Sequence, residues 1–400
     1  MTPTKQQAQA IDQFIEWFKS PIKRRNFFQL AGYAGTGKTT IAKHLAESIG
    51  GRVYFAAYTG KAAHRLIQSG CQNVSTIHKL IYVPKIKSQQ HLKELEADRA
   101  EMMTHNPIPR ELIAKINKAI ENERKNLDRP AFSLNLESPL LGADLLIVDE
   151  YSMIDQVMGE DLLSFNIPIL ALGDPGQLPP VKGSGFFGTE PDVLLTDIQR
   201  QALDSPVIWL ATEVRQGRTL KPGTYGNCSV TSVKELGKEK LGNLVIGCDQ
   251  LLVGKNATRT TSNNRVRDLI GKTSTYPMVG DKLVCLKNNH EKGLLNGQIW
   301  YSESDSEKFL SAVILNLRSE EGEKIETMVH PHYFEGTEPD FWEQKSADSF
   351  TYGYALTVHK AQGSEFGKVV LFDEWFNQNR REWLYTGITR ASESITIVSM

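Results

Sequence analysis

The chain has 400 residues, which is more than one hydrophobic core usually supports, so two or more domains are expected. Its composition, 40% hydrophobic and 23% charged, is typical of a globular protein, and no stretch has the long uncharged apolar run of a signal peptide or membrane span. We therefore expect a soluble cytoplasmic protein without a membrane partner. The net charge of -1 neither favours nor excludes nucleic acid, because acids elsewhere can balance a basic groove.

The cysteines are far apart in the sequence and form no CxxC pair. This spacing predicts free, buried thiols in a reducing compartment rather than zinc ligands or disulfides. The residues concerned are Cys71, Cys228, Cys248 and Cys285.

An amphipathic helix is expected from residue 4, because apolar side chains recur at helical spacing at Ile11, Phe14, Ile15 and Phe18. Gln7 lies near the start of this helix. Its amide offers a donor and an acceptor that adenine can use, but a helix packed on a sheet explains the residue equally well. Both interpretations stay open.

Residues 32–39, with the sequence GYAGTGKT, match the phosphate-binding pattern GxxxxGK[ST]. A short apolar strand at 26–31 precedes this loop, and a helical pattern at 40–46 follows it. Glycines let backbone N–H groups wrap round a polyphosphate at the positive end of a helix dipole. The pattern assigns Lys38 to the β and γ phosphates and the hydroxyl of Thr39 to Mg2+. The expected nucleotide contacts are Gly35, Thr36, Gly37, Lys38, Thr39 and Thr40.

Two polar turns follow in the first half of the chain. Residues 52–57 are typical of a second buried strand, and residues 58–63 (YTGKAA) turn from it into a helix, at the sheet edge where parallel α/β folds bind ligands. Residues 75–78 (STIH) form another small polar cluster. Taken alone, each is an ordinary capped loop.

Residues 81–135 are rich in charge and are expected to form an inserted helical hairpin, with most of the charges facing solvent. One apolar stripe comprises Leu112, Ile113, Ile116, Ala119 and Ile120. A weaker stripe comprises Leu92, Leu95, Met102 and Met103. Pro107 and Pro109 lie between the two.

Two adjacent acids end the apolar strand at 143–150 (ADLLIVDE). At the end of a strand beside a phosphate loop, an Asp can hold Mg2+ and the next Glu can orient and deprotonate a water for attack on the γ phosphate. Asp149 and Glu150 are predicted in these roles. A fourth strand at 167–174 leads to a loop with consecutive prolines, on which Gln177 could contact the γ phosphate or face solvent.

The alternation of strands and helices restarts near residue 191, with apolar runs at 250–254, 368–373 and 394–398. No second GxxxxGK[ST] occurs in this half, so a nucleotide would be shared across a cleft. Arg200 and Arg390 could stabilise transition-state charge from the second lobe. Each arginine in isolation fits a surface salt bridge as well.

Short alternating apolar segments, separated by turn residues, predict a small inserted β-barrel at 280–345. Trp300 in this region fits core packing better than base stacking. The loop at 356–366 then gathers hydroxyl, imidazole, ammonium and amide donors. Thr357, His359 and Lys360 could contact the phosphates of a single strand, or belong to an ordinary polar loop.

Together these motifs resemble those of superfamily 1B DNA helicases, the RecD-like and phage Dda-like group, over nearly the whole chain. The matching segments are 32–39, 57–63, 75–78, 149–153, 173–180, Arg200, 357–366 and 385–390. Tyr58 stands where the family often has proline, and its ring could stack a base.

The resemblance implies two RecA-like lobes that bind ATP and Mg2+ between them and step 5'-to-3' along single-stranded DNA. It assigns Gln7 to adenine, Gln177 to sensing the γ phosphate, and Arg200 and Arg390 to the arginine fingers. Glu365 is a further expected nucleotide contact. The expected DNA contacts are Tyr58, Thr59, Lys61, His78, Thr357, His359 and Lys360.

We therefore expect an α/β fold with two RecA-like P-loop lobes. Lobe 1A comprises 1–80 and 136–190, lobe 2A comprises 191–279 and 346–400, and the insertions are a mainly helical 1B at 81–135 and an SH3-like barrel, 2B, at 280–345. Because 1B is expected to be helical, a strand-separating β-hairpin cannot be assumed there.

The predicted function is an ATP-dependent DNA helicase or translocase that acts on single strands and on junctions with duplex. We expect it to be monomeric, in a bacterial or phage-infected cell, with replication or recombination proteins as candidate partners. Two alternatives stay open: an RNA or RNA–DNA translocase, and a P-loop ATPase that remodels protein complexes without unwinding.

Overall fold

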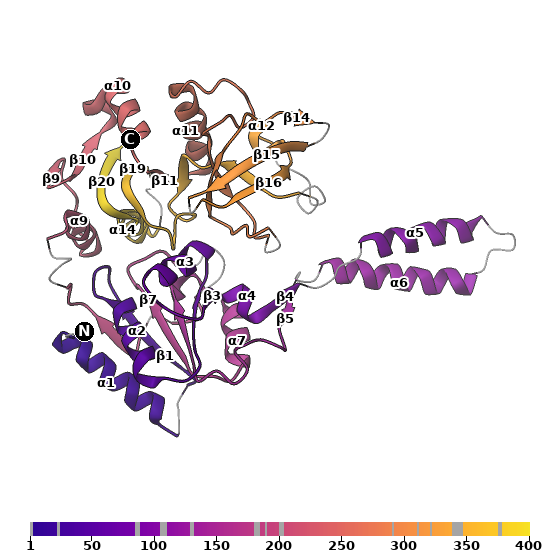
Figure 1. Cartoon of the computed structure of the whole chain (residues 1–400), viewed down its shortest axis with the longest axis horizontal. Coiled ribbons are helices and arrows are strands. Elements are labelled where there is room, and N and C mark those ends of the chain that lie inside the picture. Colours follow the sequence, from indigo (N-terminus) through magenta and orange to yellow (C-terminus); the bar gives the residue numbers. More distant parts are fainter. Residues whose placement is uncertain are drawn as a thin grey trace. The chain divides into compact units, whose positions relative to one another are not determined.

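Figure 1 shows a computed structural model of the chain, which describes residues 3–21, 25–84, 89–104, 110–128, 132–179, 185–188, 190–199, 204–289, 292–309, 312–320, 322–337, 347–374 and 378–400. It divides into two compact units. The first comprises Met1–Ile77 with Gly142–Met400, and the second comprises His78–Leu141.

A six-stranded sheet forms the N-terminal part of the first unit, in the order β3-β2-β6-β7-β1-β8. Every neighbouring pair is parallel. The strands are β1 (Phe27–Gly32), β2 (Val53–Ala57), β3 (Val74–Thr76), β6 (Leu145–Asp149), β7 (Ile169–Gly173) and β8 (Val193–Leu195). Because parallel strands end at one edge, the phosphate loop after β1 and the acids at the end of β6 meet there, as the sequence predicts.

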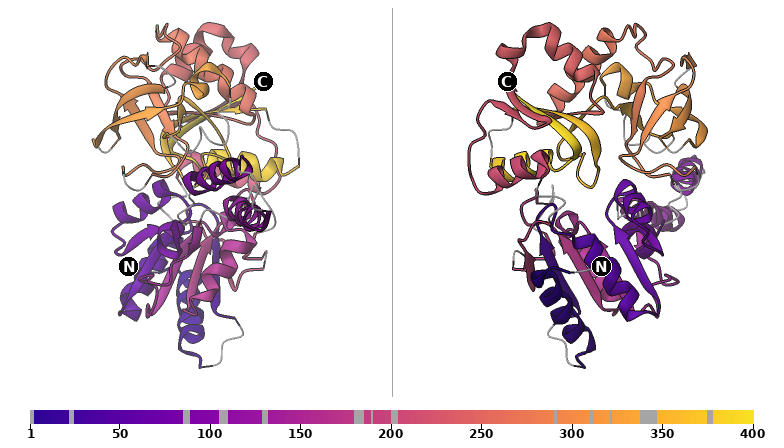
Figure 2. Two further views of the ribbon diagram at one scale, coloured as in Figure 1. Left: turned by 90° about the vertical axis from the view of Figure 1, so that its right-hand side faces the viewer. Right: turned by 60° about the vertical axis from the view of Figure 1, so that its left-hand side comes forward.

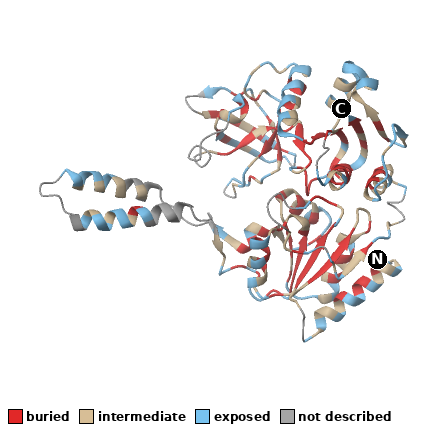
Figure 3. Cartoon of the chain, turned by 180° about the vertical axis from the view of Figure 1, so that it is seen from behind, coloured by how far each residue is buried: buried red, intermediate tan, exposed pale blue. Residues whose placement is uncertain are grey.

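One face of this first sheet is covered by α1 (Lys5–Lys19), α2 (Lys38–Ile49) and α3 (Gly60–Gln68), whose apolar side chains share a core cluster with alternate strand residues. Thr4 caps α1 in a capping box with Gln7, which explains why the helix begins at Lys5. The central strands are buried along their whole length (Figure 3). The short helix η1 (Tyr151–Met153) and α7 (Gln156–Ser164) follow β6.

A second six-stranded sheet has the order β18-β11-β19-β20-β10-β9 and is parallel except for its β9 edge. Its strands are β9 (Gly223–Tyr225), β10 (Cys228–Ser232), β11 (Gln250–Val253), β18 (Ala355–Thr357), β19 (Phe366–Asp373) and β20 (Ala391–Ser399). The long C-terminal strands, yellow in Figure 2, lie at its centre. The predicted loop at 356–366 begins inside β18. The sequence did not reveal this strand because three residues are too few to show a period.

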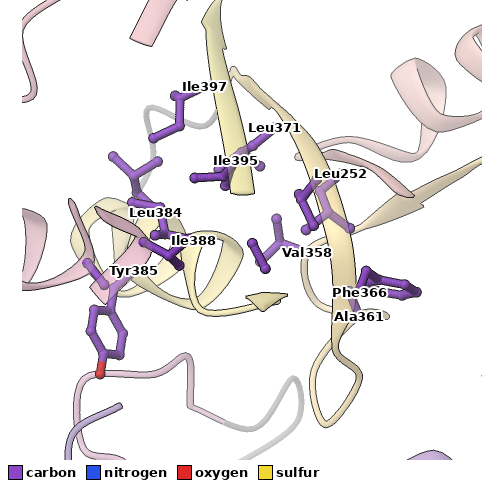
Figure 4. Close-up of a cluster of buried hydrophobic side chains, with 14 of the residues drawn as sticks. Leu252, Val358, Ala361, Phe366, Leu371, Leu384, Tyr385, Ile388, Ile395 and Ile397 are labelled. Atoms are coloured by element: carbon purple, nitrogen blue, oxygen red, sulfur yellow. The ribbon is translucent and has the colours of Figure 1, made fainter. Parts of the chain in front are cut away.

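Helices cover the second sheet on both faces. Apolar residues of α9 (Pro206–Arg215) and α14 (Arg380–Ile388) share one core cluster with the strands (Figure 4), and those of α10 (Val233–Ile246) share another. The remaining helix, α11 (Asn256–Leu269), follows β11 and packs on β11 and β18. Asn263 of α11 fixes this packing, because its side chain exchanges two hydrogen bonds with the backbone of Ala355.

A third, antiparallel sheet has the order β14-β15-β13-β12-β17, with β16 paired to β15. Its strands are β12 (Lys282–Cys285), β13 (Ile299–Ser302), β14 (Lys308–Phe309), β15 (Ala312–Ser319), β16 (Lys324–Val329) and β17 (Phe350–Tyr352), and α12 (His332–Glu335) follows β16. A bridge between Val329 and Asp348 brings the far edges together, so the sheet curls. Trp300 is fully buried in its core, as core packing predicts.

The expected end of insertion 2B at residue 345 does not coincide with the end of the third sheet. Strand β17 lies beyond that residue and pairs with β12. Strand β17 (Phe-Thr-Tyr) has too few residues to show an alternating pattern. The sequence therefore does not distinguish it from β18, which begins three residues after the end of β17 and belongs to the second sheet.

The second unit contains α4 (Ile77–Ile81, which begins at its boundary), β4 (Tyr82–Pro84), α5 (Gln89–Met103), α6 (Arg110–Asp128) and β5 (Phe132–Leu134). Helices α5 and α6 pack together, as the helical hairpin predicts. In the α6 stripe Ile120 is buried but Leu112 is exposed. The antiparallel pair β4–β5, which the sequence prediction missed, joins the two ends of the hairpin.

The predicted α/β fold with parallel sheets at its core is confirmed. All cysteines are free, and Cys71, Cys228 and Cys285 are buried while Cys248 is half-buried. Within the described segments, no helix combines the length and apolar character that crossing a membrane requires.

Candidate nucleotide-binding cleft

A cleft of about 380 Å³ lies between the edge of the first sheet and the start of β20. It brings together most of the residues predicted to bind or hydrolyse the nucleotide. Those that line it are Gly35, Gly37, Lys38, Thr39, Thr40, Asp149, Glu150, Gln177, Glu365 and Arg390.

The phosphate loop has the conformation that its glycines permit. Gly35 and Gly37 have φ angles of 79° and 82°, in the left-handed region that side chains rarely adopt. A Cβ on Gly37 would also lie 2.5 Å from the amide nitrogen of Gln199. Helix α2 starts directly after this loop without a side-chain cap, so its first N–H groups face the cleft as an anion site. The Nζ of Lys38 donates to the carbonyl of Gly32 at 2.6 Å, inside the loop.

Gln7 has both ends of its amide engaged within the protein. Its Nε2 donates to the carbonyl of Thr36 in the phosphate loop at 3.0 Å, and its Oε1 accepts from the backbone N–H of Thr4 at 3.0 Å. The side chain is 2% exposed. In this structure Gln7 therefore supports the phosphate loop, and Gln6 beside it holds the residues after β8 by accepting from the N–H groups of Thr196 and Asp197.

The acids at the end of β6 differ in their surroundings. Asp149 is buried, and its Oδ1 accepts from the N–H of Glu150 at 3.0 Å, while its Oδ2 has no hydrogen-bond partner among the described residues. Burial raises the pKa of Asp149, and the charge of Glu150 raises it further. Glu150 has a φ of 56°, which turns its side chain out of the strand direction. A buried carboxylate oxygen without a hydrogen-bond donor among the described residues, in the cleft that Thr39 also lines, fits the hard oxygen ligands that Mg2+ prefers.

Gln177 is buried, so the interpretation in which it faces solvent is wrong. Its Oε1 lies within the protein without a hydrogen-bond partner among the described residues. The loop that carries it is held from the second sheet, because the N–H of Leu178 donates to Thr386 Oγ1 at 2.9 Å and Gln362 Nε2 donates to the carbonyl of Leu178 at 3.1 Å.

Tyr385 on α14 links the two sides of the cleft. Its ring borders the apolar cluster of the second sheet, and its hydroxyl points away from that cluster (Figure 4). The hydroxyl donates to Asp174 Oδ2 at 2.7 Å and accepts from the N–H of Ala34, in the phosphate loop, at 2.9 Å. Burial raises the pKa of Tyr385 well above its usual value, so the hydroxyl stays protonated and can donate. Nearby, the guanidinium of Arg215 lies 3.7 Å from the ring centre of Tyr33.

Replacing Tyr385 with phenylalanine tests this link. We expect Tyr385→Phe to lower the free energy of unfolding by about 1–3 kcal/mol, because Asp174 and the Ala34 N–H lose their shared partner in a buried setting. Urea denaturation measures this change in the free energy of unfolding. The matched control is Tyr225→Phe, whose exposed hydroxyl donates only to the Lys221 carbonyl and should change stability by less than about 0.5 kcal/mol. Equal effects of the two variants would contradict the proposed link.

Arg390, directly after α14, is 2% exposed, so the interpretation as a surface salt bridge is wrong. Its guanidinium donates to the carbonyls of Thr386 and Ser364 and to Thr389 Oγ1, each at 3.1 Å. Burial lowers the pKa of Arg390 from that of a free arginine, while the charge of Glu150 raises it. Arg200, the other predicted finger, lies outside the described residues.

Several residues predicted to contact DNA lie on two elements of the first unit. Thr59 caps α3 by accepting from the N–H of Ala62, and Lys61 follows it. Thr357 ends β18, where it is 6% exposed and accepts from the N–H of Lys360. Burial lowers the pKa of His359, and it lowers that of Lys360 to about 8, with a contribution from Arg259.

The other two predicted DNA contacts have different surroundings. Tyr58 is half-buried at the end of β2. Burial raises its pKa, as does Asp155. His78 belongs to the second unit, where its ring lies 5.7 Å from that of Tyr82.

Sequence reasoning missed three residues of this region: Arg65, Tyr385 as a link, and Arg259. Tyr385 begins a matched motif and Arg65 comes two positions after one, whereas Arg259 lies on α11, far from all of them in the sequence. None of the three has a pattern of its own. Arg65 could be found only from the fold, which brings α3 to the end of β6.

The AAA domain family matches residues 3–226, and the UvrD-like helicase C-terminal domain matches residues 352–398. The ATP-dependent RecD2 DNA helicase of Deinococcus radiodurans is 28% identical over 396 residues, which cover 91% of this chain and 46% of that protein. The chain belongs to the AAA domain family and to the superfamily 1B helicases.

Other superfamily 1B proteins are similar over shorter or more distant matches. The ATP-dependent DNA helicase dda of Enterobacteria phage T4 is 27% identical over 217 residues, covering 50% of this chain and 40% of that protein. The crystal structure of Bacteroides Pif1 bound to single-stranded DNA has a TM-score of 0.54 at 18% identity, covering 99% of this chain and 92% of that one. This likeness shows a shared fold. The superfamily 1B chain described here spans about half the length of the curated relatives.

Proposed function

We propose that this superfamily 1B chain is an ATP-dependent DNA translocase and helicase that moves 5'-to-3' on single-stranded DNA. One observation carries the proposal: a single cleft contains a phosphate loop and paired acids from one sheet, and a buried arginine that directly precedes a strand of the other. Hydrolysis in such a cleft changes how the two sheets are held together, which is what stepping along a strand requires.

The residues of the cleft have distinct roles in this proposal. Lys38 binds the β and γ phosphates, Glu150 orients and deprotonates the attacking water, and Arg390 stabilises the charge that develops on the γ phosphate. Gln177 senses the γ phosphate, and Gln7 is proposed to reach the adenine when the nucleotide displaces its present contacts. Glu365 contacts the nucleotide from the second sheet, and Arg200 is the second finger.

Thr39 and Asp149 would hold Mg2+, which supplies charge neutralisation of the phosphates when bound. The Oδ2 of Asp149 supports this assignment, because this buried carboxylate oxygen has no hydrogen-bond donor among the described residues, and the Nη2 of Arg65 lies 3.9 Å from it, beyond hydrogen-bond distance.

Lobe 1A is proposed to hold the first sheet and lobe 2A the second, with the third sheet as the SH3-like insertion 2B and the helical hairpin as 1B. Strand contacts are proposed at Thr59 and Lys61 of lobe 1A and at Thr357, His359 and Lys360 of lobe 2A. The ring of Tyr58 would stack on a base, and His78 would contact the strand from the second unit.

ATP turnover measured with matched oligonucleotides tests the proposal. We expect single-stranded DNA to raise kcat by about tenfold or more, because strand contacts on both lobes favour the closed cleft. Equal or greater stimulation by RNA would favour the RNA or RNA–DNA translocase. Turnover indifferent to any oligonucleotide would favour a protein-remodelling ATPase and contradict the proposal.

Direction is tested separately, on duplexes with a single-stranded tail. We expect unwinding from a 5' tail. Activity with the 3' tail only would contradict the 5'-to-3' assignment. Sedimentation under the same conditions tests whether the active species is the proposed monomer. We further propose that this monomer acts in the cytoplasm with replication or recombination proteins as partners.

A further inference from the structure

Arg65 lies among acids that belong to both sides of the cleft. Its Nη1 lies 3.1 Å from Glu365 Oε2, and its Nη2 lies 3.9 Å from Asp149 Oδ2 and 3.8 Å from Glu150 Oε1. The guanidinium of an arginine stays protonated at neutral pH, so Arg65 faces these three acids as a cation. Its guanidinium therefore faces the same Asp149 oxygen that has no hydrogen-bond donor.

Helix α3 connects Arg65 to the proposed strand contacts of lobe 1A. Thr59 caps the helix, Lys61 lies in its first turn, and Arg65 follows four residues later on the same face. Lys61 Nζ lies 4.2 Å from the ring centre of Phe366 and 3.6 Å from Glu320. This face of α3 thus packs along the start of β19, with its strand-binding end and its Arg65 end on one rigid element.

The loop between β18 and β19 connects Glu365 to the proposed strand contacts of lobe 2A. Thr357 ends β18, and His359 and Lys360 precede Glu365 in the loop. The loop also lies against the start of α3, because a Cβ on Gly363 would lie 3.0 Å from Thr59 Oγ1. A strand held by this loop and by the start of α3 would change how the loop and the helix meet. The Arg65–Glu365 pair joins the same two elements further along the helix.

We propose that Arg65 is a positioning residue that couples strand binding to the acids of the ATP site. This inference depends on the proposed function. Without a strand, the guanidinium competes with Mg2+ for Asp149 and with water for Glu150. With a strand bound, the loop and Glu365 draw the guanidinium away, and both carboxylates become available to the nucleotide site.

The first test is the Mg2+ dependence of binding a non-hydrolysable ATP analogue, measured by fluorescence anisotropy without DNA. In Arg65→Gln we expect half-maximal binding at a Mg2+ concentration about fivefold lower than in the wild type. A change of this magnitude corresponds to the free energy that a partly exposed charge contact contributes. Arg65→Lys, which keeps the charge but not the forked geometry, should fall between the two. A merely structural role would weaken analogue binding at every Mg2+ concentration, and that result, or an unchanged midpoint, would overturn the inference.

The second test is turnover with and without single-stranded DNA. Arg65→Gln should raise strand-free turnover by about threefold to fivefold and lower the stimulation ratio by the same factor. The matched control is Arg218→Gln, since Arg218 is exposed and, among the described residues, forms its ion pair with Glu213, outside the cleft. An unchanged stimulation ratio in Arg65→Gln would overturn the inference.

The two proposals fail in different ways. If no oligonucleotide stimulates the wild type, the proposed function fails, and the Mg2+ midpoint alone then decides whether Arg65 competes for Asp149. If the wild type is stimulated and Arg65→Gln behaves like it, only the role of Arg65 fails. Should Arg65→Gln not fold, the midpoint of Arg65→Lys decides, and a wild-type value overturns the inference.

Discussion

Glu150→Gln is expected to abolish ATP turnover while ATP binding is retained. The carboxylate follows Asp149 at the end of a buried strand, in a left-handed conformation that directs it into the cleft. An amide cannot accept the proton of the attacking water, so kcat should fall by about a hundredfold to ten-thousandfold. Steady-state turnover and binding of a fluorescent ATP analogue measure the two effects separately.

Glu160→Gln is the matched control for this change. Glu160 lies on α7, ten residues further along the chain, where it is exposed and, within the described part of the chain, its side chain accepts from the amide of Gln156. Its replacement should leave kcat within about twofold of the wild type. If Glu150→Gln kept DNA-stimulated turnover, Glu150 would not be the base, and the assignment of the whole acid pair would be wrong.

Arg390→Ala is expected to have the second large effect, a loss of about a hundredfold to a thousandfold in kcat. The guanidinium is the buried cation of the second sheet that lines the cleft, and the charge of Glu150 acts on it. Arg390→Lys should lose most of the activity too, because an ammonium group cannot donate to Thr386, Ser364 and Thr389 in the same planar arrangement. Quench-flow measurement of a single turnover isolates the chemical step.

The stability of the variant must be measured alongside its activity, since alanine removes the guanidinium that donates to the carbonyls of Thr386 and Ser364, although the Thr386 carbonyl keeps the Thr389 hydroxyl as a donor. Thermal melting shows whether the variant is folded at the assay temperature. Arg381→Lys serves as the control, because Arg381 lies at the exposed start of α14 and pairs with its neighbour Glu382. A wild-type kcat for folded Arg390→Ala would remove Arg390 from the finger role.

The residues that line the candidate nucleotide-binding cleft were largely predictable from the sequence, because they lie at the ends of strands whose order is evident. The loop at 32–39 needs its glycines wherever it occurs, and the acids at 149–150 end a strand that has no polar residue in its interior. Parallel strands bring both to one edge without further information. The same argument placed Gln177 at that edge, but only burial excludes the solvent-facing alternative.

Strands that are too short to show an alternating hydrophobic pattern were not predictable from the sequence. Strands β5 and β17 have three residues each, too few to distinguish an alternating pattern from a loop, and their partners β4 and β12 are distant in the chain. For the same reason, the boundary of insertion 2B was placed before β17 and not after it. The direction of side chains was also hidden, as with Gln7, whose amide binds the phosphate loop itself.

By itself, the amino-acid sequence determined the α/β class, the phosphate loop, the acid pair and the membership in superfamily 1B, because local patterns and motif order carry that information. Only the tertiary structure decided which groups meet across the cleft. Tyr385 bonds to Ala34 and Asp174, which lie 351 and 211 positions away in the sequence. Arg65 contacts acids on both sides of the cleft, and one of them, Glu365, lies 300 positions away. Contacts between residues so far apart depend on how helices and sheets pack, and no local pattern in the chain encodes that packing.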